Sequence, residues 1–179
     1  MANLPPTDSY GDLPGPSVEE IPEGDNRKRL VCPDCGFIAY QNPKIVSGAL
    51  CVHEDRYLLC RRDIEPRKGF WTFPAGYLEL NESTAEGAVR EAREEANAII
   101  EIESLIGIYE LPHISQLYVI HLARLTDPNV SAGDETLEVG LFHWDDIPWD
   151  DLAFSSVKWA LERHRAGAAP DVGYSEPGF

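Results

Sequence analysis

Apolar and polar residues follow regular patterns along most of the chain, and these patterns predict a mixed α/β structure. Alternating or β-branched runs predict strands over residues 44–52, 57–61, 70–73, 99–109, 116–125 and 137–144. Apolar positions at helical spacing predict two helices, over residues 83–97 and 155–165. Strands combined with one central and one terminal helix are typical of an α/β layer fold.

The central helix has recognisable signals at both ends. Ser83 and Glu86 have the spacing of a capping box, so we expect the helix to begin at Ser83. Asn97 stands where the helix should end, and Asn is the second choice after Gly for a left-handed cap. The face expected to pack on a sheet consists of Ala85, Ala88, Val89, Ala92 and Ala96.

Three carboxylates share another face of this helix. Glu91, Glu94 and Glu95 stand at i, i+3 and i+4, where like charges cost a helix about 0.2–0.5 kcal/mol per pair. A cation would remove this repulsion, and hard oxygen ligands suit Mg²⁺, Mn²⁺ or Ca²⁺ better than zinc. Carbonyls of the preceding loop, including that of Ala75, are expected to complete the site. A solvated acidic face would show the same pattern, so the cluster alone leaves both interpretations open.

The wider sequence around these acids resembles the motif of the Nudix hydrolases. That motif has a Gly, a Glu six residues later and, after seven residues, Arg-Glu-apolar-x-Glu-Glu-x-Gly-apolar. The matching residues here are Gly76, Glu82, Arg90, Glu91, Ala92, Glu94, Glu95, Asn97 and Ala98, with Asn97 in place of the second Gly. The resemblance spans residues 44–165 and implies a Nudix-type α/β/α sandwich around a mixed β-sheet.

The resemblance also implies an activity. Nudix hydrolases cleave the pyrophosphate of nucleoside diphosphates linked to another group, using divalent ions to activate water. We therefore expect Mg²⁺ or Mn²⁺ as cofactor, with Glu91, Glu94 and Glu95 as ligands and the last two as catalytic residues. The alternative is a binding module or nucleotide sensor that has the fold without the chemistry.

Further residues extend the expected site. The motif residues Gly76, Glu82 and Arg90 are expected to orient the helix and its loop. Nudix enzymes commonly add an acid from a late strand or loop, and Glu138 is the first candidate for this catalytic ligand or base. Glu135 is the second candidate. Either residue can instead be a surface acid.

The expected partner is a small nucleotide substrate. Arg62 and Arg67 precede the motif and are expected to meet the diphosphate or the distal ribose, although both can also be surface charges. Tyr77 is one of several aromatic residues that can stack on a base or belong to the core.

Short segments favour one group of Nudix substrates. Residues 64–69, 111–114 and 147–149 look similar to the subgroup that includes FAD and ADP-ribose pyrophosphohydrolases. NADH pyrophosphatases carry a Ser-Gln-Pro-Trp-Pro-Phe-Pro pattern, of which this chain has only the Ser-Gln at 115–116. We therefore expect ADP-ribose or FAD as substrate.

Residues 27–43 resemble the second half of a zinc ribbon that some Nudix enzymes carry before the domain. Cys32 and Cys35 form a Cys-x-x-Cys-Gly knuckle, but a structural zinc needs four ligands and no second knuckle precedes them. Zinc binding would require Cys51, Cys60 or His53 to be recruited. The alternative is a ribbon-like hairpin that packs without metal.

Composition limits the other function classes. The chain has 31 acidic and 15 basic residues, a net charge of −16, which argues against nucleic-acid binding. No signal peptide and no run of about 18 apolar residues is visible, so we expect a cytoplasmic protein without membrane contact. Residues 1–26 and 166–179 are rich in Pro, Gly and polar residues and are expected to be flexible tails. A homodimer is left open.

Overall fold

The computed structural model describes residues 15–175, and the chain divides between Asn42 and Pro43 into two compact units. In the first unit, strands β1 (Val18–Glu20), β2 (Arg29–Val31) and β3 (Ile38–Ala39) form a three-stranded antiparallel sheet. Strand β1 lies within the range expected to be a flexible tail. It pairs with β2 because the turn between them brings Val18 opposite Val31.

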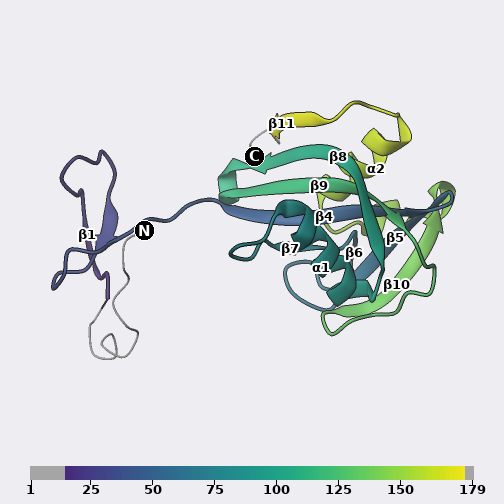
Figure 1. Cartoon of the computed structure of the whole chain (residues 1–179), viewed down its shortest axis with the longest axis horizontal. Helices are drawn as coiled ribbons and strands as arrows, with labels where there is room; N and C mark the ends of the chain where they lie inside the picture. Colours follow the sequence, from purple (N-terminus) through teal and green to yellow (C-terminus); the bar gives the residue numbers. More distant parts are fainter. Residues whose placement is uncertain (1–14, 176–179) are drawn as a thin grey trace. The chain divides into compact units, whose positions relative to one another are not determined.

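The second unit is built around a mixed sheet (Figure 1). Its strand order is β10-β5-β4-β9-β8-β11, with β6 paired to β5 and β7 paired to β4. The pairs β4·β9 and β8·β11 are parallel and the other pairs are antiparallel. The strands are β4 (Lys44–His53), β5 (Arg56–Arg62), β6 (Trp71–Thr72), β7 (Ala75–Tyr77), β8 (Ile100–Leu111), β9 (Gln116–Leu125), β10 (Thr136–His143) and β11 (Asp171–Ser175).

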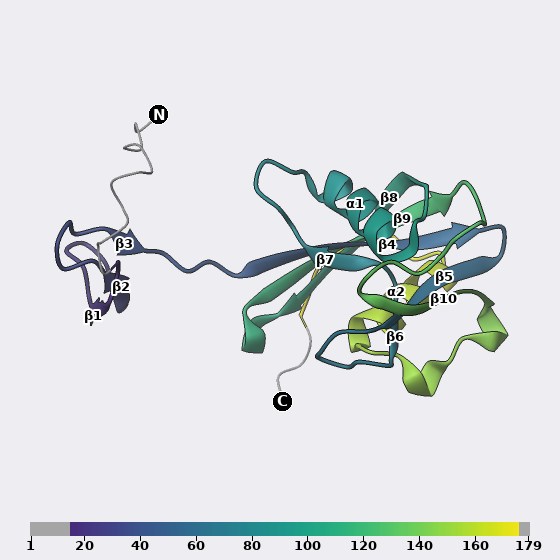
Figure 2. The same cartoon turned by 90° about the horizontal axis from the view of Figure 1, so that it is seen from below.

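One helix covers each face of this sheet. Helix α1 (Thr84–Ala96) packs its alanines on Ala49, Ala123 and other small or aliphatic residues of one face. Helix α2 (Ser155–Arg165) packs on the other face over a larger aromatic core that includes Phe73 and Tyr109. Figure 2 shows α1 lying along one side of the sheet. The predicted α/β/α sandwich is therefore confirmed.

The remaining elements are single turns of 3₁₀ helix. They are η2 (Pro112–Ile114), η3 (Trp144–Asp146) and η4 (Trp149–Asp151). Within residues 15–175, neither α1 nor α2 has the length and apolar character that crossing a bilayer requires.

The predicted ends of α1 are confirmed. The Ser83 hydroxyl accepts the Glu86 N–H at 3.2 Å, and the Glu86 carboxylate accepts the Ser83 N–H at 2.9 Å. Asn97 ends the helix in the left-handed conformation, with φ at 49°. The expected buried face was wrong at Val89, which is 39% exposed, whereas Ala88, Ala92 and Ala96 are fully buried.

Two strands of the second unit also lie where the sequence suggested irregular structure. Residues 75–77, expected as loop, form β7 beside β4, and Gly48 allows this because a Cβ there would lie 2.5 Å from Ala75 Cβ. Residues 171–175, expected as flexible tail, form β11 beside β8. Gly107 permits that pairing, since a Cβ there would lie 2.3 Å from Asp171 O.

The Cys32–Cys35 knuckle is folded but does not provide a zinc site of its own. The Cys32 carbonyl accepts the Gly36 N–H at 2.9 Å, and backbone N–H groups of Cys35 and Asp34 lower the pKa of the Cys32 thiol. The chain has no Cys or His before Cys32.

The other candidate zinc ligands lie in the second unit. Cys51 and Cys60 are fully buried in the core beneath α1, and burial raises the pKa of both thiols. His53 bonds the Leu125 carbonyl at 3.0 Å. Two thiols are half of the four-ligand set of a structural zinc, so the residues present do not fit that metal.

We therefore predict that the purified protein holds well below one zinc per chain. Elemental analysis after dialysis measures this content, and Cys35→Ser should leave both the content and the melting temperature unchanged. A full zinc equivalent that resists a chelator and disappears in Cys35→Ser would contradict the prediction.

Candidate active site

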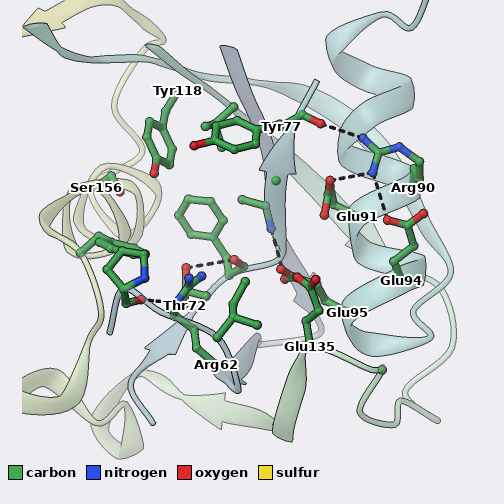
Figure 3. A pocket seen from close by; sticks show the side chains of 18 of the residues that line it. Arg62, Thr72, Tyr77, Arg90, Glu91, Glu94, Glu95, Tyr118, Glu135 and Ser156 are labelled. Carbon is green, nitrogen blue, oxygen red and sulfur yellow. Dashed lines mark hydrogen bonds and ion pairs between the residues drawn. The ribbon is translucent and has the colours of Figure 1, made fainter. Parts of the chain in front are cut away.

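A cavity of about 1000 Å³ opens in the second unit between the two helices (Figure 3). Acidic side chains of α1 form one wall, and residues of β7 and the loop that precedes β10 continue it. The opposite wall comes from β9 and the start of α2, where Tyr118 and Ser156 lie. The cavity is therefore built from segments far apart in sequence.

Arg90 organises the acidic wall. Its Nε lies 2.8 Å from Glu82 Oε1, and its Nη1 lies 2.6 Å from Glu91 Oε1 and 3.0 Å from Glu94 Oε2. Its Nη2 donates to the Tyr77 carbonyl at 3.0 Å. Arg90 thus ties α1 to the strand β7. Glu86, one turn before Arg90, is absent from this set because its carboxylate bonds Ser83 in the capping box.

Glu82 and Gly76 both lie at the contact between helix α1 and the chain segment before it. Glu82 Oε2 accepts the Glu79 N–H at 3.0 Å, which fixes the loop between β7 and α1. A Cβ on Gly76 would lie within 2.2–2.5 Å of the Glu91 carboxylate. Glycine at this position therefore makes room for the Glu91 side chain, which is 11% exposed.

Glu91 and Glu95 are carboxylates that burial has made hard to ionise. Burial raises the pKa of Glu91, although the Arg90 guanidinium opposes this shift. Burial, together with repulsion from Glu91, raises the pKa of Glu95 to about 8. Glu95 Oε2 accepts the Ala75 N–H at 3.3 Å, and the structure records no ion pair for Glu95 among residues 15–175.

Glu135 and Glu138, the two candidates for the additional catalytic acid residue, lie in different places. Glu135 lines the cavity, and Figure 3 shows it beside Glu95. Its negative charge contributes to the raised pKa of both Glu91 and Glu95. Glu138, the first candidate from the sequence, is outside the lining and lies 3.6 Å from Arg61 Nη1.

Only two of the three expected substrate-binding residues line the cavity. Arg62 and Tyr77 line the cavity, whereas Arg67 does not and lies over the Phe70 ring at 5.1 Å. Arg62 Nε donates to the Pro66 carbonyl at 2.9 Å, and its guanidinium lies over the Phe154 ring. Tyr77 is held by Gln116, whose Nε2 lies 3.2 Å from the tyrosine hydroxyl.

Several residues that line the cavity have no recognisable signal in the sequence. Thr72, Phe154 and Ser156 line the cavity, and none belongs to a motif with a recognisable spacing. Ser156 is 2% exposed at the start of α2. The position of that helix end above the sheet depends on the whole fold, so no local signal identifies these residues.

The acidic side chains that line the cavity do not converge on one point. Among residues 15–175, no group of three His, Cys, Asp or Glu side chains is arranged as a ready metal site. The reason is visible in the contacts: Arg90 holds Glu91 and Glu94, and Glu95 faces the Ala75 N–H. Hard oxygen donors and uncompensated burial at Glu95 nonetheless fit a divalent cation in chemical type.

The raised pKa of Glu95 predicts how the metal-free protein responds to pH. The folded state retains a proton up to about pH 8, whereas the unfolded chain releases it near the ordinary value of 4.5. The resulting stability is present at low pH and is lost as the pH rises through this range. In EDTA, the melting temperature should fall by several degrees between about pH 5 and about pH 9.

Glu95→Gln should flatten this dependence and raise the melting temperature at the upper end. Glu94→Gln, which removes one charge from the exposed side of the same helix, is the control. Equal slopes for wild type and Glu95→Gln in thermal unfolding would contradict the assignment.

Comparisons with known proteins agree with this geometry. The NUDIX domain model matches residues 42–161, and the model of the Nudix N-terminal zinc ribbon matches residues 15–41. A crystal structure of a NUDIX hydrolase from Nitrosomonas europaea is 43% identical, with a TM-score of 0.82, and the match covers 90% of this chain and 96% of that one.

Two curated relatives are more distant. An ADP-ribose pyrophosphatase of Methanocaldococcus jannaschii is 28% identical, and the match covers 66% of this chain and 72% of the relative. A NAD-capped RNA hydrolase NudC of Pseudomonas aeruginosa is also 28% identical. That match covers 83% of this chain but 54% of the relative, so the chain spans about half of its length. Because the domain model covers more than half of the chain and the motif lies on the predicted helix, the protein belongs to the Nudix family and is a Nudix hydrolase.

Proposed function

We propose that the protein hydrolyses the pyrophosphate bond of a nucleoside diphosphate linked to another group, in a reaction that requires Mg²⁺ or Mn²⁺. The observation that carries this proposal is a pair of carboxylates beside a large cavity, the buried Glu91 and the half-buried Glu95, both with raised pKa values. Perturbed carboxylates in a cleft are a common mark of catalytic sites. The same pair argues against a nucleotide sensor that lacks catalytic activity. Binding alone does not require two carboxylates to be held close together where their ionisation is unfavourable.

The proposed metal ligands are Glu91, Glu94 and Glu95, with the carbonyl of Ala75 as a further donor. A divalent cation bound there would neutralise phosphate oxygens and lower the pKa of the attacking water. Arg90 already pairs with two of these acids, so they would exchange part of its contact for the cation. Glu82 would hold the guanidinium in place during this exchange, since it bonds both Nε and Nη2.

The proposed base is Glu135. It lies beside Glu95 at the cavity, where a carboxylate can accept a proton from water that attacks phosphorus. Glu138 is the weaker candidate, because it is half exposed and paired with Arg61. The proposal therefore reverses the order of the two acids that the sequence suggested.

ADP-ribose is the proposed substrate. The cavity of about 1000 Å³ is at the upper end of the range for small-molecule sites, and it suits a two-part nucleotide. A relative of the chain is named as an ADP-ribose pyrophosphatase. Arg62 would meet the diphosphate, and Tyr77 and Tyr118, which also line the cavity, would contact the base or ribose.

The first test is a substrate panel of ADP-ribose, FAD, NADH and diadenosine polyphosphates, each with Mg²⁺ or Mn²⁺. We expect turnover of ADP-ribose that stops in EDTA and returns with either metal. Glu95→Gln should lower kcat by about 100-fold or more, because a ligand charge is lost. Binding without turnover, or turnover unchanged in EDTA, would contradict the proposal.

Glu86→Gln is the matched control for that variant. It makes the same change on the same helix but outside the cavity lining. Its kcat should stay near the wild-type value, with a loss of at most about 1 kcal/mol in stability from the altered capping box.

A second pair of variants tests whether Glu135 or Glu138 acts as the base. Glu135→Gln should lower kcat by about 10²–10⁴-fold, the usual contribution of a general base. Glu138→Gln should retain kcat within about twofold, because an exposed ion pair contributes little. Steady-state kinetics at several pH values measure both, and the reverse order of effects would restore Glu138 as the candidate base.

A further inference from the structure

The loop between β9 and β10 is attached to the end of α1 by a residue that departs from the Nudix motif. Asn97 stands where the motif has Gly, and its backbone adopts the left-handed conformation that Gly adopts easily. Its side-chain Nδ2 lies 3.1 Å from both the carbonyl and the hydroxyl oxygen of Ser131, and 3.5 Å from the Ala132 carbonyl. A glycine at position 97 would give the same helix end without these bonds.

Backbone bonds continue the attachment. The Ser131 N–H donates to the Ala96 carbonyl at 3.0 Å, and the Gly133 N–H donates to the Glu95 carbonyl at 3.0 Å. Both carbonyls belong to the last turn of α1, where carbonyl groups have no hydrogen-bond partner within the helix. A Cβ on Gly133 would lie 1.7 Å from the Glu94 carbonyl oxygen, so a glycine is needed for this approach.

The attached loop leads directly to Glu135. The Thr136 N–H donates to the Gly133 carbonyl at 3.2 Å, and the Glu135 carbonyl accepts the Asp63 N–H at 2.9 Å. Glu135 is therefore held between the end of α1 and the end of β5. We infer that Asn97 is a positioning residue, which fixes this loop so that Glu135 lies beside Glu95 in the cavity. This inference rests on the proposed role of Glu135.

The matched variants are Asn97→Gly and Asn81→Gly. Asn97→Gly introduces the motif residue, which keeps the left-handed helix end and removes the side-chain amide. Asn81 is also a left-handed Asn, with φ at 65°, but it lies in the loop before α1, outside the cavity lining. Its side chain forms no hydrogen bond with any residue in the described range 15–175. Asn81→Gly therefore makes the same chemical change without breaking an attachment.

We expect Asn97→Gly to lower kcat for ADP-ribose in Mg²⁺ by about fivefold, with KM within about twofold, since one exposed hydrogen-bond network is lost. Asn81→Gly should leave both constants unchanged. The double variant Asn97→Gly/Glu135→Gln should be no slower than Glu135→Gln alone, because Asn97 acts through Glu135. If Asn97 only stabilised the fold, Asn97→Gly would instead lower kcat by the same factor in the wild-type protein and in Glu135→Gln.

Hydrogen exchange gives a readout that does not depend on turnover. The amides of Ser131 and Gly133 should exchange faster in Asn97→Gly and at the wild-type rate in Asn81→Gly. Unchanged exchange, or faster exchange with a wild-type kcat, would overturn the inference. If Glu135→Gln itself retains full activity, the proposed base is wrong and the inference falls with it. A normal Asn97→Gly beside an impaired Glu135→Gln would refute the inference alone.

Discussion

The close approach of α1 to the sheet is the constraint on which the rest of this structure depends. Ala88, Ala92 and Ala96 are fully buried, and they face residues as small as Ala49 and Ala123 on the strands. Small side chains on both surfaces allow the helix to lie near the sheet. A larger residue at any of these positions would push the helix outward, since protein interiors have little free volume.

This approach brings charged groups into a place where charge is unfavourable. The next face of the helix carries Glu91 and Glu95 against β7, where Gly76 leaves room for the first carboxylate. Arg90 offsets part of the repulsion by binding Glu82, Glu91 and Glu94 together. Within the part of the chain that the structure describes, Glu95 forms no such ion pair, and its pKa rises to about 8. The fold thus concentrates its electrostatic cost on the residue nearest to the proposed chemistry, as active sites often do.

The sequence predicted those features that depend on neighbouring residues. The ends of α1 follow from local hydrogen bonds of Ser83, Glu86 and Asn97, and the long strands follow from alternating patterns. Strands β7 and β11 were missed because they are short and form only when a glycine of another strand admits them. Such pairing joins distant segments, and periodicity within one segment contains no signal for it.

The choice between Glu135 and Glu138 shows the same limit in the site. Both acids lie near the start of β10, three residues apart, and the sequence favours neither on physical grounds. The register of β10 against β5 shifts between Thr136 and Glu138, which leaves Glu138 opposite Arg61. Glu135 precedes the shift, in the loop attached to α1. Where a strand is irregular, spacing alone cannot tell which side chain enters a cavity.

Under the proposed function, the charge of the cavity would link metal binding to substrate binding. Seven acidic residues line it, against three arginines: the acids are Glu65, Glu79, Glu91, Glu94, Glu95, Asp134 and Glu135, and the arginines are Arg62, Arg90 and Arg93. A diphosphate carries negative charge, and the chain as a whole has a net charge of −16. Without added cations, repulsion would oppose entry of such a substrate before any bond is broken.

Under the proposed function, the cation therefore has two effects that arise from one interaction. It makes ionisation of Glu95 favourable, and it converts an acidic wall into one that attracts phosphate. Arg90 and Arg62 cannot replace it, because Arg90 is engaged by three carboxylates and Arg62 is held by the Pro66 carbonyl. Substrate affinity and turnover should accordingly depend on the same metal concentration, as expected when a bound ion is the largest positive charge in an acidic site.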